Sequence, residues 1–196
     1  MATPRPPKPD DPPRGRDAVR AAVLAAAEQL FAERGYAAVS VRDLAQAAGV
    51  NHGLIHRHFG SKEAVLHAVL QGMFSDVAAA AASRIQPGDP DFLVQVYPLV
   101  TSRKRHWQIL MRAVLDGFDF RAAGFQFPIT AGMMAHTAAR TGADDEEARV
   151  LAGLLVSGGL GWLLLETYLT PVLGLEHVPT EELRQRMAER VGRVLP

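Results

Sequence analysis

Three histidines and one arginine lie within the seven residues from His52 to His58, and a lysine follows at position 62. Imidazole and guanidinium groups hydrogen-bond to phosphate oxygens and base edges, and Arg57 could contact either. Lys62 comes at the start of a helical segment, where a cation opposes the helix dipole. A cation is favourable there if that helix end docks on a phosphate, which its free N–H groups also bind. The spacing therefore predicts a nucleic-acid contact.

The same residues allow other interpretations. His52 and His56 are four residues apart and could bind zinc together, although a catalytic zinc usually needs a third protein ligand and the segment has no HExxH glutamate. The histidines could also form a solvated polar face, and Lys62 could make an ordinary surface pair with Glu63. We expect no metal site, and the choice between a polar face and a nucleic-acid contact stays open here.

Two short helices joined by a glycine turn are expected to hold these side chains. Ser40 and Asp43 are spaced as a capping-box variant at the start of the first helix. Asn51 is the only asparagine in the chain and a good N-cap for the second helix, whose inward residues are Ile55 and Phe59. A short helix, a turn and a second helix with polar side chains can enter a DNA major groove.

Helical periodicity extends through most of the 196 residues. A first helix is expected from Asp17 to Gly35 and a fourth from Ser61 to about Ile85. Further helices are expected at about 90–101, 104–116, 127–140, 144–169 and 179–194. No segment alternates as a strand would. We predict an all-α protein with a disordered, Pro-rich tail (1–13), a three-helix helix-turn-helix domain (14–62) and a C-terminal helical bundle (63–196).

Composition restricts the function further. The chain has 21 basic and 21 acidic residues, so its zero net charge argues against a protein that coats nucleic acid. Residues 14–62 hold seven Arg or Lys and four Asp or Glu, which gives +3 and leaves −3 for the rest. The chain has no cysteine, which suits a reducing cytosol. Its uncharged apolar stretch from Val150 to Leu165 is shorter than the ~20 residues of a membrane-spanning helix, so we expect a cytoplasmic protein without a membrane partner.

Residues 18 to 66 resemble the DNA-binding domain of TetR-family transcriptional regulators. The matching positions are Leu30-Phe31, Gly35-Tyr36, Ser40-Val41-Arg42-Asp43-Leu44-Ala45, Ala48-Gly49-Val50, Gly53, Ile55, His58-Phe59 and Ser61-Lys62-Glu63. The resemblance implies that the third helix enters the groove. It implies that the residues near base edges are Arg42, Asn51, His52 and Gly53. It implies that the residues near phosphates are Ser40, His56, Arg57, His58 and Lys62.

Two positions depart from the usual pattern of the family. Leu54 stands where the family usually has Thr, which removes a hydroxyl. His56 stands where the family usually has Tyr, and an imidazole changes its charge close to neutral pH. We therefore expect the DNA affinity to depend on pH. Arg14 and Arg16, just before the first helix, could reach an adjacent minor groove or could be solvated linker charges.

The second half of the chain is rich in aromatic residues and methionine, which could line an apolar cavity between helices. The segment from Asp116 to Phe127 contains four phenylalanines and is expected to be a mobile loop beside a cavity entrance or a dimer contact. Glu166 is either buried with a partner or exposed at its helix end. The residues expected to line a site for a small apolar or aromatic effector are His106, Trp107, Met111, Phe118, Phe127, Met134, Trp162 and Glu166.

The last two helices are expected to form a homodimer interface. The 144–169 helix is apolar nearly all round, unlike a helix at a free surface. Small residues at i, i+4 and i+8 leave a smooth face on it: Gly153, Ser157 and Gly161. The final helix carries an apolar stripe of Leu183, Met187 and Val191.

Together these features predict a ligand-responsive, homodimeric repressor that binds double-stranded DNA at a palindromic operator and needs no cofactor. One alternative is a helical enzyme with a His/Glu metal site. The chain has no paired-ligand motif, catalytic-triad signature or phosphate loop, so we expect no enzyme activity. The other alternative is a TetR-like protein that binds partners instead of DNA.

Overall fold

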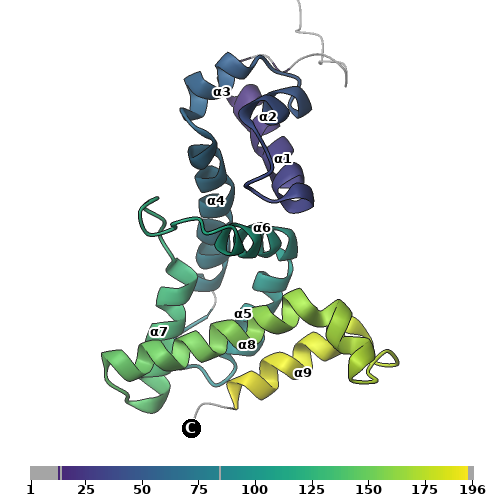
Figure 1. Cartoon of the computed structure of the whole chain (residues 1–196). Coiled ribbons are helices and arrows are strands. Elements are labelled where there is room, and N and C mark those ends of the chain that lie inside the picture. Colours follow the sequence, from purple (N-terminus) through teal and green to yellow (C-terminus); the bar gives the residue numbers. More distant parts are fainter. Residues whose placement is uncertain (1–12, 14, 84, 194–196) are drawn as a thin grey trace, which may run out of the picture.

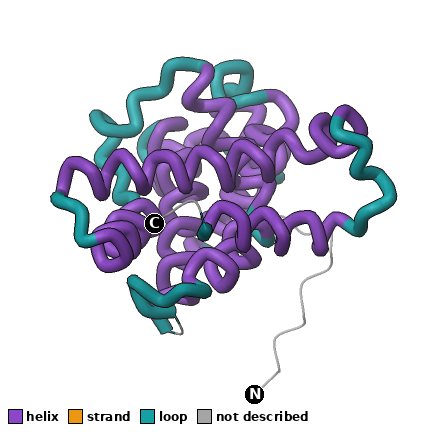
Figure 2. Tube along the Cα trace, turned by 90° about the horizontal axis from the view of Figure 1, so that it is seen from below, coloured by secondary structure: helices purple, strands orange, loops and turns teal. Residues whose placement is uncertain are grey.

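The computed structural model describes residues 13, 15–83 and 85–193, so residues 1–12 of the expected tail and Arg14 lie outside the described part. Within that part the chain forms helices joined by loops and no strand (Figure 2), which confirms the all-α prediction. The helices are α1 (Arg16–Arg34), α2 (Val41–Ala47), α3 (His52–Phe59), α4 (Lys62–Ala82), α5 (Phe92–Thr101), α6 (Lys104–Leu115), α7 (Pro128–Thr141), α8 (Asp145–Val172) and α9 (Thr180–Gly192).

Helices α1, α2 and α3 form a head at one end of the molecule, and α4 runs from this head into the helical body (Figure 1). The core of the head is made by fully buried side chains from each of its helices, among them Phe31, Leu44 and Ile55. Leu66 and Leu70 of α4 are equally buried and extend this core toward the body. The head and α4 are therefore packed together as one hydrophobic unit.

Local capping signals fix where the short helices begin. Ser40 and Asp43 form the expected capping box, in which each side chain accepts a hydrogen bond from the other residue's backbone N–H. Asn51 caps α3 through its Oδ1, which accepts from the Gly53 N–H at 2.8 Å. Since these bonds satisfy N–H groups that lack a partner within the helix, they set the register of α3.

The body consists of α5 to α9 together with the lower part of α4. Helix α8 packs against α7 and α9, and α9 packs against α5, while α6 crosses under the head and contacts α1 (Figure 1). The helix bounds agree with the expected ones to within three residues. Helix α8 extends past its expected end at 169 because the Leu173 N–H still bonds to the Leu169 carbonyl, although Pro171 lies in that turn.

Two helices, α4 and α8, are long and apolar enough to cross a membrane by length and composition alone, a test that the core helix of a soluble protein also passes. Helix α4 packs against helices of both the head and the body. Helix α8 packs against α6, α7 and α9, which cover part of its surface. Its other side, with the residue that follows it, exposes large apolar side chains: Val150, Leu154, Leu165, Tyr168, Val172 and Leu173.

Candidate DNA interface and effector cavity

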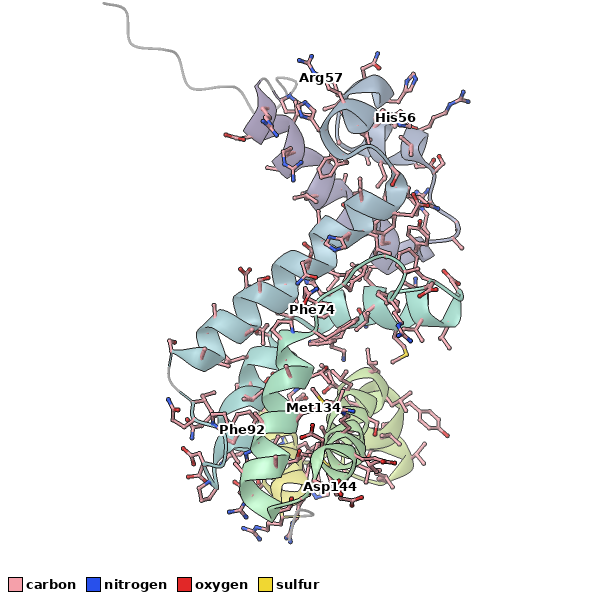
Figure 3. All side chains as sticks on the ribbon, turned by 90° about the vertical axis from the view of Figure 1, so that its left-hand side faces the viewer. His56, Arg57, Phe74, Phe92, Met134 and Asp144 are labelled. Carbon is pink, nitrogen blue, oxygen red and sulfur yellow. The ribbon has the colours of Figure 1, made fainter. Side chains whose placement is uncertain are left out.

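Helix α3 presents an exposed polar surface at the free end of the head. In Figure 3, Arg57 and His56 lie at the end of the molecule opposite Met134 and Asp144. The exposed residues at this end include most of those that the resemblance places near DNA: Ser40, Arg42, Asn51, His52, Gly53, His56 and Arg57. His58 and Lys62 are half-buried instead. The buried side of α3 is anchored by Ile55.

Arg20 of α1 holds the C-terminal end of α3. Its Nη1 donates a hydrogen bond to the His58 carbonyl at 2.9 Å, and its guanidinium lies 4.5 Å from the centre of the Phe59 ring. The bond satisfies a carbonyl in the last turn of α3, and the stacking adds a cation–π attraction. Arg20 is a positioning residue that sequence reasoning missed, since nothing local distinguishes it from a solvated arginine on α1.

The backbone fixes the orientation of the His56 ring. Its Nδ1 lies 3.0 Å from the Gly60 carbonyl oxygen. Because a carbonyl only accepts, Nδ1 carries a proton in this bond, and Nε2 is left to meet an outside partner. The neutral ring then offers a lone pair at Nε2, whereas the protonated ring offers an N–H that a phosphate can accept.

Lys62 and Glu63 both bind Tyr36 rather than each other. The Lys62 Nζ donates to the Tyr36 carbonyl at 2.9 Å and lies 4.1 Å from the centre of its ring. The Tyr36 hydroxyl donates to Glu63 Oε1 at 2.7 Å. Burial, with the Glu63 carboxylate second, raises the pKa of Tyr36 above its ordinary value, and the same hydrogen bond lowers the pKa of Glu63. Tyr36 thus fixes the first turn of α4, directly after α3.

The body contains a partly open cavity of about 300 Å³ between α4, α5, α6, α7, α8 and α9. Its wall is apolar apart from Thr130 and Tyr97, and the Tyr97 hydroxyl already donates to the Gly159 carbonyl at 3.1 Å. The lining residues are Phe74, Leu93, Val96, Tyr97, Val100, Trp107, Leu110, Val114, Phe120, Phe127, Ile129, Thr130, Met133, Leu155, Val156, Gly159, Leu160, Met187, Ala188 and Val191. Since none of these carries a charge, the cavity suits an uncharged apolar molecule.

The residues expected around an effector lie in several places. Trp107 and Phe127 line the cavity. Trp162 and Glu166 line a separate hollow of about 290 Å³ between α8 and the start of α9. The remaining four lie outside both: His106, Met111, Phe118 and Met134. Sequence reasoning missed most of the wall because its residues, such as Val96 and Val100, have the same helical spacing as ordinary core.

Three polar residues of the body link separate parts of the chain, and two of them, Glu166 and His136, are buried. Glu166 of α8 pairs with Lys104 of α6 and Arg184 of α9, so it is buried with partners. His106 of α6 lies with Nε2 at 3.7 Å from Glu28 of α1, and burial lowers its pKa. Buried His136 accepts a hydrogen bond from the backbone of residue 88, and burial lowers its pKa too. In the part of the chain that the structure describes, no three His, Asp or Glu side chains gather as metal ligands would.

A compact three-helix head with an exposed polar third helix, joined by one long helix to a body that contains an apolar cavity, defines a helix-turn-helix transcriptional regulator. Residues 23–69 match the sequence model of the bacterial regulatory proteins of the tetR family. Over 183 residues the chain is 34% identical to the HTH-type transcriptional repressor Rv3405c of Mycobacterium tuberculosis, which covers 93% of this chain and 92% of that protein. The chain therefore belongs to the TetR family and is a DNA-binding transcriptional regulator.

Other relatives agree with this assignment. The chain is 42% identical over 71 residues to the HTH-type transcriptional repressor KstR2 of Rhodococcus jostii, or 36% of this chain and 35% of that protein. The fold matches SCO4942 of Streptomyces coelicolor with a TM-score of 0.69 at 20% identity, over 91% of this chain and 98% of that one. It matches the multidrug binding protein EbrR, complexed with malachite green, with a TM-score of 0.64 at 22% identity, over 90% of this chain and 98% of that one.

Proposed function

We propose that this regulator is a cytoplasmic, homodimeric repressor that leaves its palindromic operator when a small apolar or aromatic effector fills the body cavity. The uncharged cavity of about 300 Å³ carries the effector part of the proposal. Two relatives named as repressors support repression: Rv3405c, which matches over most of the chain, and KstR2, which matches over about a third of it. The protein acts by binding, without a cofactor or a catalytic site of its own.

We assign DNA binding and effector binding to different parts of the chain. Residues 14–62 bind DNA, and residues 63–196 bind the effector and dimerise. The base contacts are assigned to Arg42, Asn51, His52 and Gly53, and the phosphate contacts to Ser40, His56, Arg57, His58 and Lys62. The exposure of α3 at the free end of the head supports this assignment, as does the geometry of His56. Lys62 keeps two of its three N–H donors for a phosphate while it holds the Tyr36 carbonyl.

Dimerisation rests on the uncovered face of α8. Its exposed apolar side chains recur at helical spacing on one face, and an exposed apolar patch of this kind marks an interaction site. A second copy that packs its own α8 there would bury the patch on both subunits and make an interface with two-fold symmetry. The α9 stripe expected in this interface faces inward instead, because Leu183 is buried and Met187 and Val191 line the cavity. The same symmetry places two α3 helices on one side of the dimer, where half-sites one DNA turn apart, about 34–36 Å, would receive them.

The experiment that tests this function is selection of bound DNA from a random pool at fixed salt, followed by titration of the selected operator. Arg57→Ala is expected to weaken binding about tenfold or more and, if Arg57 holds a phosphate, to lower the salt slope by about 1. Arg140→Ala is the matched control, because Arg140 is an exposed arginine on α7 in the body. Equal affinity of both variants would refute the assignment of Arg57, and a pool that yields no preferred sequence would favour the partner-binding alternative.

A further inference from the structure

The loop from Asp116 to Phe127, between α6 and α7, contacts the DNA-binding head and the effector cavity at the same time. It leaves α6 directly under the head and enters α7 beside the cavity (Figure 1). Glycines with positive φ at 117 and 124, at 76° and 72°, allow its two sharp turns. No other role of this loop follows from DNA binding or from dimerisation.

At the head end the loop makes two contacts with the turn after α1. Asp116 Oδ2 accepts a hydrogen bond from the Ala37 backbone N–H at 3.2 Å. The Phe118 ring meets the Tyr36 ring edge-to-face, with 5.2 Å between the centroids and 78° between the planes. Edge-to-face pairs at this distance are attractive and depend on orientation, so a shift of one ring acts on the other.

At the cavity end the same loop supplies part of the wall. Phe120 lines the cavity, and its ring centroid is 4.9 Å from that of Phe118. Phe120 also packs on the buried Phe125 at 5.0 Å. Gln126 fixes the far end of the loop, because its backbone exchanges two hydrogen bonds with the Gln71 side chain of α4. The continuous ring contacts therefore run from the cavity wall through Phe118 to Tyr36.

We propose that Phe118 and Tyr36 couple the cavity to the DNA-binding head as positioning residues. A ligand that displaces Phe120 shifts Phe118 against Tyr36. Tyr36 in turn holds Lys62 and the first turn of α4 through its carbonyl and its ring, so the shift moves Lys62 and the C-terminal end of α3, where phosphate contacts are assigned. The inference rests on the proposed effector function and names the path by which that effector acts.

The path has a thermodynamic consequence that can be measured. If a ligand in the cavity and the operator DNA favour different positions of the loop, each weakens the binding of the other. The two factors must be equal, and they are commonly about 5- to 150-fold. A ligand with equal affinity for both positions would shift nothing. The ratio of ligand dissociation constants with and without operator DNA therefore reports the coupling itself, separately from either affinity.

The test uses Nile red, an uncharged aromatic dye whose fluorescence rises in apolar sites, and the operator selected from the random pool. For the full-length protein we expect its dissociation constant to rise at least about fivefold with saturating operator. Phe118→Leu keeps an apolar side chain but removes the ring edge, so the ratio should fall to about 1. Phe120→Leu removes one of the two ring contacts that join the cavity wall to Phe118, the other being Phe125, and should lower the ratio toward 1. The test therefore also holds if one variant folds poorly.

Phe127→Leu is the matched control in the same loop. Phe127 lines the cavity and contacts Phe74 and Phe125, but its ring makes no contact with Phe118 or Tyr36. It should weaken Nile red binding with and without DNA alike and leave the ratio at the wild-type value. Coupling that persists in Phe118→Leu and Phe120→Leu overturns the relay and leaves the effector function standing. Failure of Nile red to bind the wild type, or equal binding with and without DNA, overturns the effector function and the relay with it.

Discussion

The carboxylate of Glu166 is the point at which α6, α8 and α9 are tied together. Arg184 donates to it twice, from Nε at 3.0 Å and from Nη2 at 2.7 Å, and Lys104 Nζ lies 2.5 Å from Oε1. The Glu166 side chain is 11% exposed, against 17% for Arg184 and 27% for Lys104. Burial alone would raise the pKa of Glu166, but the bonds from Arg184 and Lys104 outweigh it and hold the pKa below its ordinary value.

Glu166→Gln keeps the shape of the side chain and removes its charge. Breaking a buried ion pair by removing one partner costs about 3–5 kcal/mol, and the lower end applies because Lys104 is partly exposed and Arg184 keeps its bond to Glu181. A loss of about 3 kcal/mol lowers the Tm of a chain of this size by roughly 6–12 °C. The measurement is thermal unfolding followed by circular dichroism at one fixed protein concentration, because the proposed dimerisation would make Tm concentration-dependent.

Glu181→Gln is the control, since Glu181 binds the same arginine at 2.6 Å but is 81% exposed. An ion pair with so exposed a partner contributes about 0–1 kcal/mol to stability. The Tm of Glu181→Gln should therefore differ from that of the wild type by no more than roughly 4 °C. Equal decreases in Tm for the two variants would refute the argument that burial makes the Glu166 ion pair strongly stabilising.

A carboxyl whose pKa is lowered by folding stabilises the protein above its unfolded pKa, about 4.3, and this stabilisation is lost as the pH falls through the folded pKa. The Tm difference between wild type and Glu166→Gln should therefore be constant near neutral pH and shrink in acid.

Three further predictions concern DNA binding and assembly. Leu154→Glu places a charge on the uncovered face of α8 and should convert the dimer to a monomer in sedimentation velocity, whereas a dimer of unchanged stability would show that another face associates. Asn51→Ala removes the cap of α3 and should cost about 1 kcal/mol of unfolding free energy, with Asn51→Ser close to wild type in the same urea titration. His56→Phe removes the ring nitrogen left free for an outside partner and should weaken operator binding, and an unchanged affinity would show that this ring makes no bond to DNA.

The head could be predicted nearly to the residue because its determinants are local. The capping box of Ser40 and Asp43 and the Asn51 cap act within three residues of themselves, so their types and spacing are enough to locate α2 and α3. The inward position of Ile55 follows from helical geometry in the same way. Helix-forming periodicity likewise placed the body helices, since each carries its own apolar stripe.

The contacts that position the DNA-binding residues join residues far apart in the sequence, so they could not be predicted from it. Arg20 reaches the carbonyl of a residue 38 positions away, and Lys62 reaches Tyr36 across 26. Lys62 looked like a phosphate ligand or a partner of Glu63, and its contact with Tyr36 arises only once α1 and α4 pack together. The aromatic residues of the body posed a similar problem, because helical spacing does not tell a cavity wall from a filled core.

The two ends of α6 resist displacement to very different degrees, and this difference decides where an effector can act. At its N-terminal end, Lys104 is bound to buried Glu166, a pair whose disruption costs several kcal/mol. At its C-terminal end the link to the head is one backbone hydrogen bond from Ala37 to Asp116 and the edge-to-face contact of Phe118, worth about 1 kcal/mol each. A molecule that enlarges the cavity along α6 therefore moves the C-terminal end first, because that movement breaks the weaker contacts. That end carries the Phe118 contact with Tyr36, whereas the N-terminal end also reaches α1 of the head through His106 and Glu28.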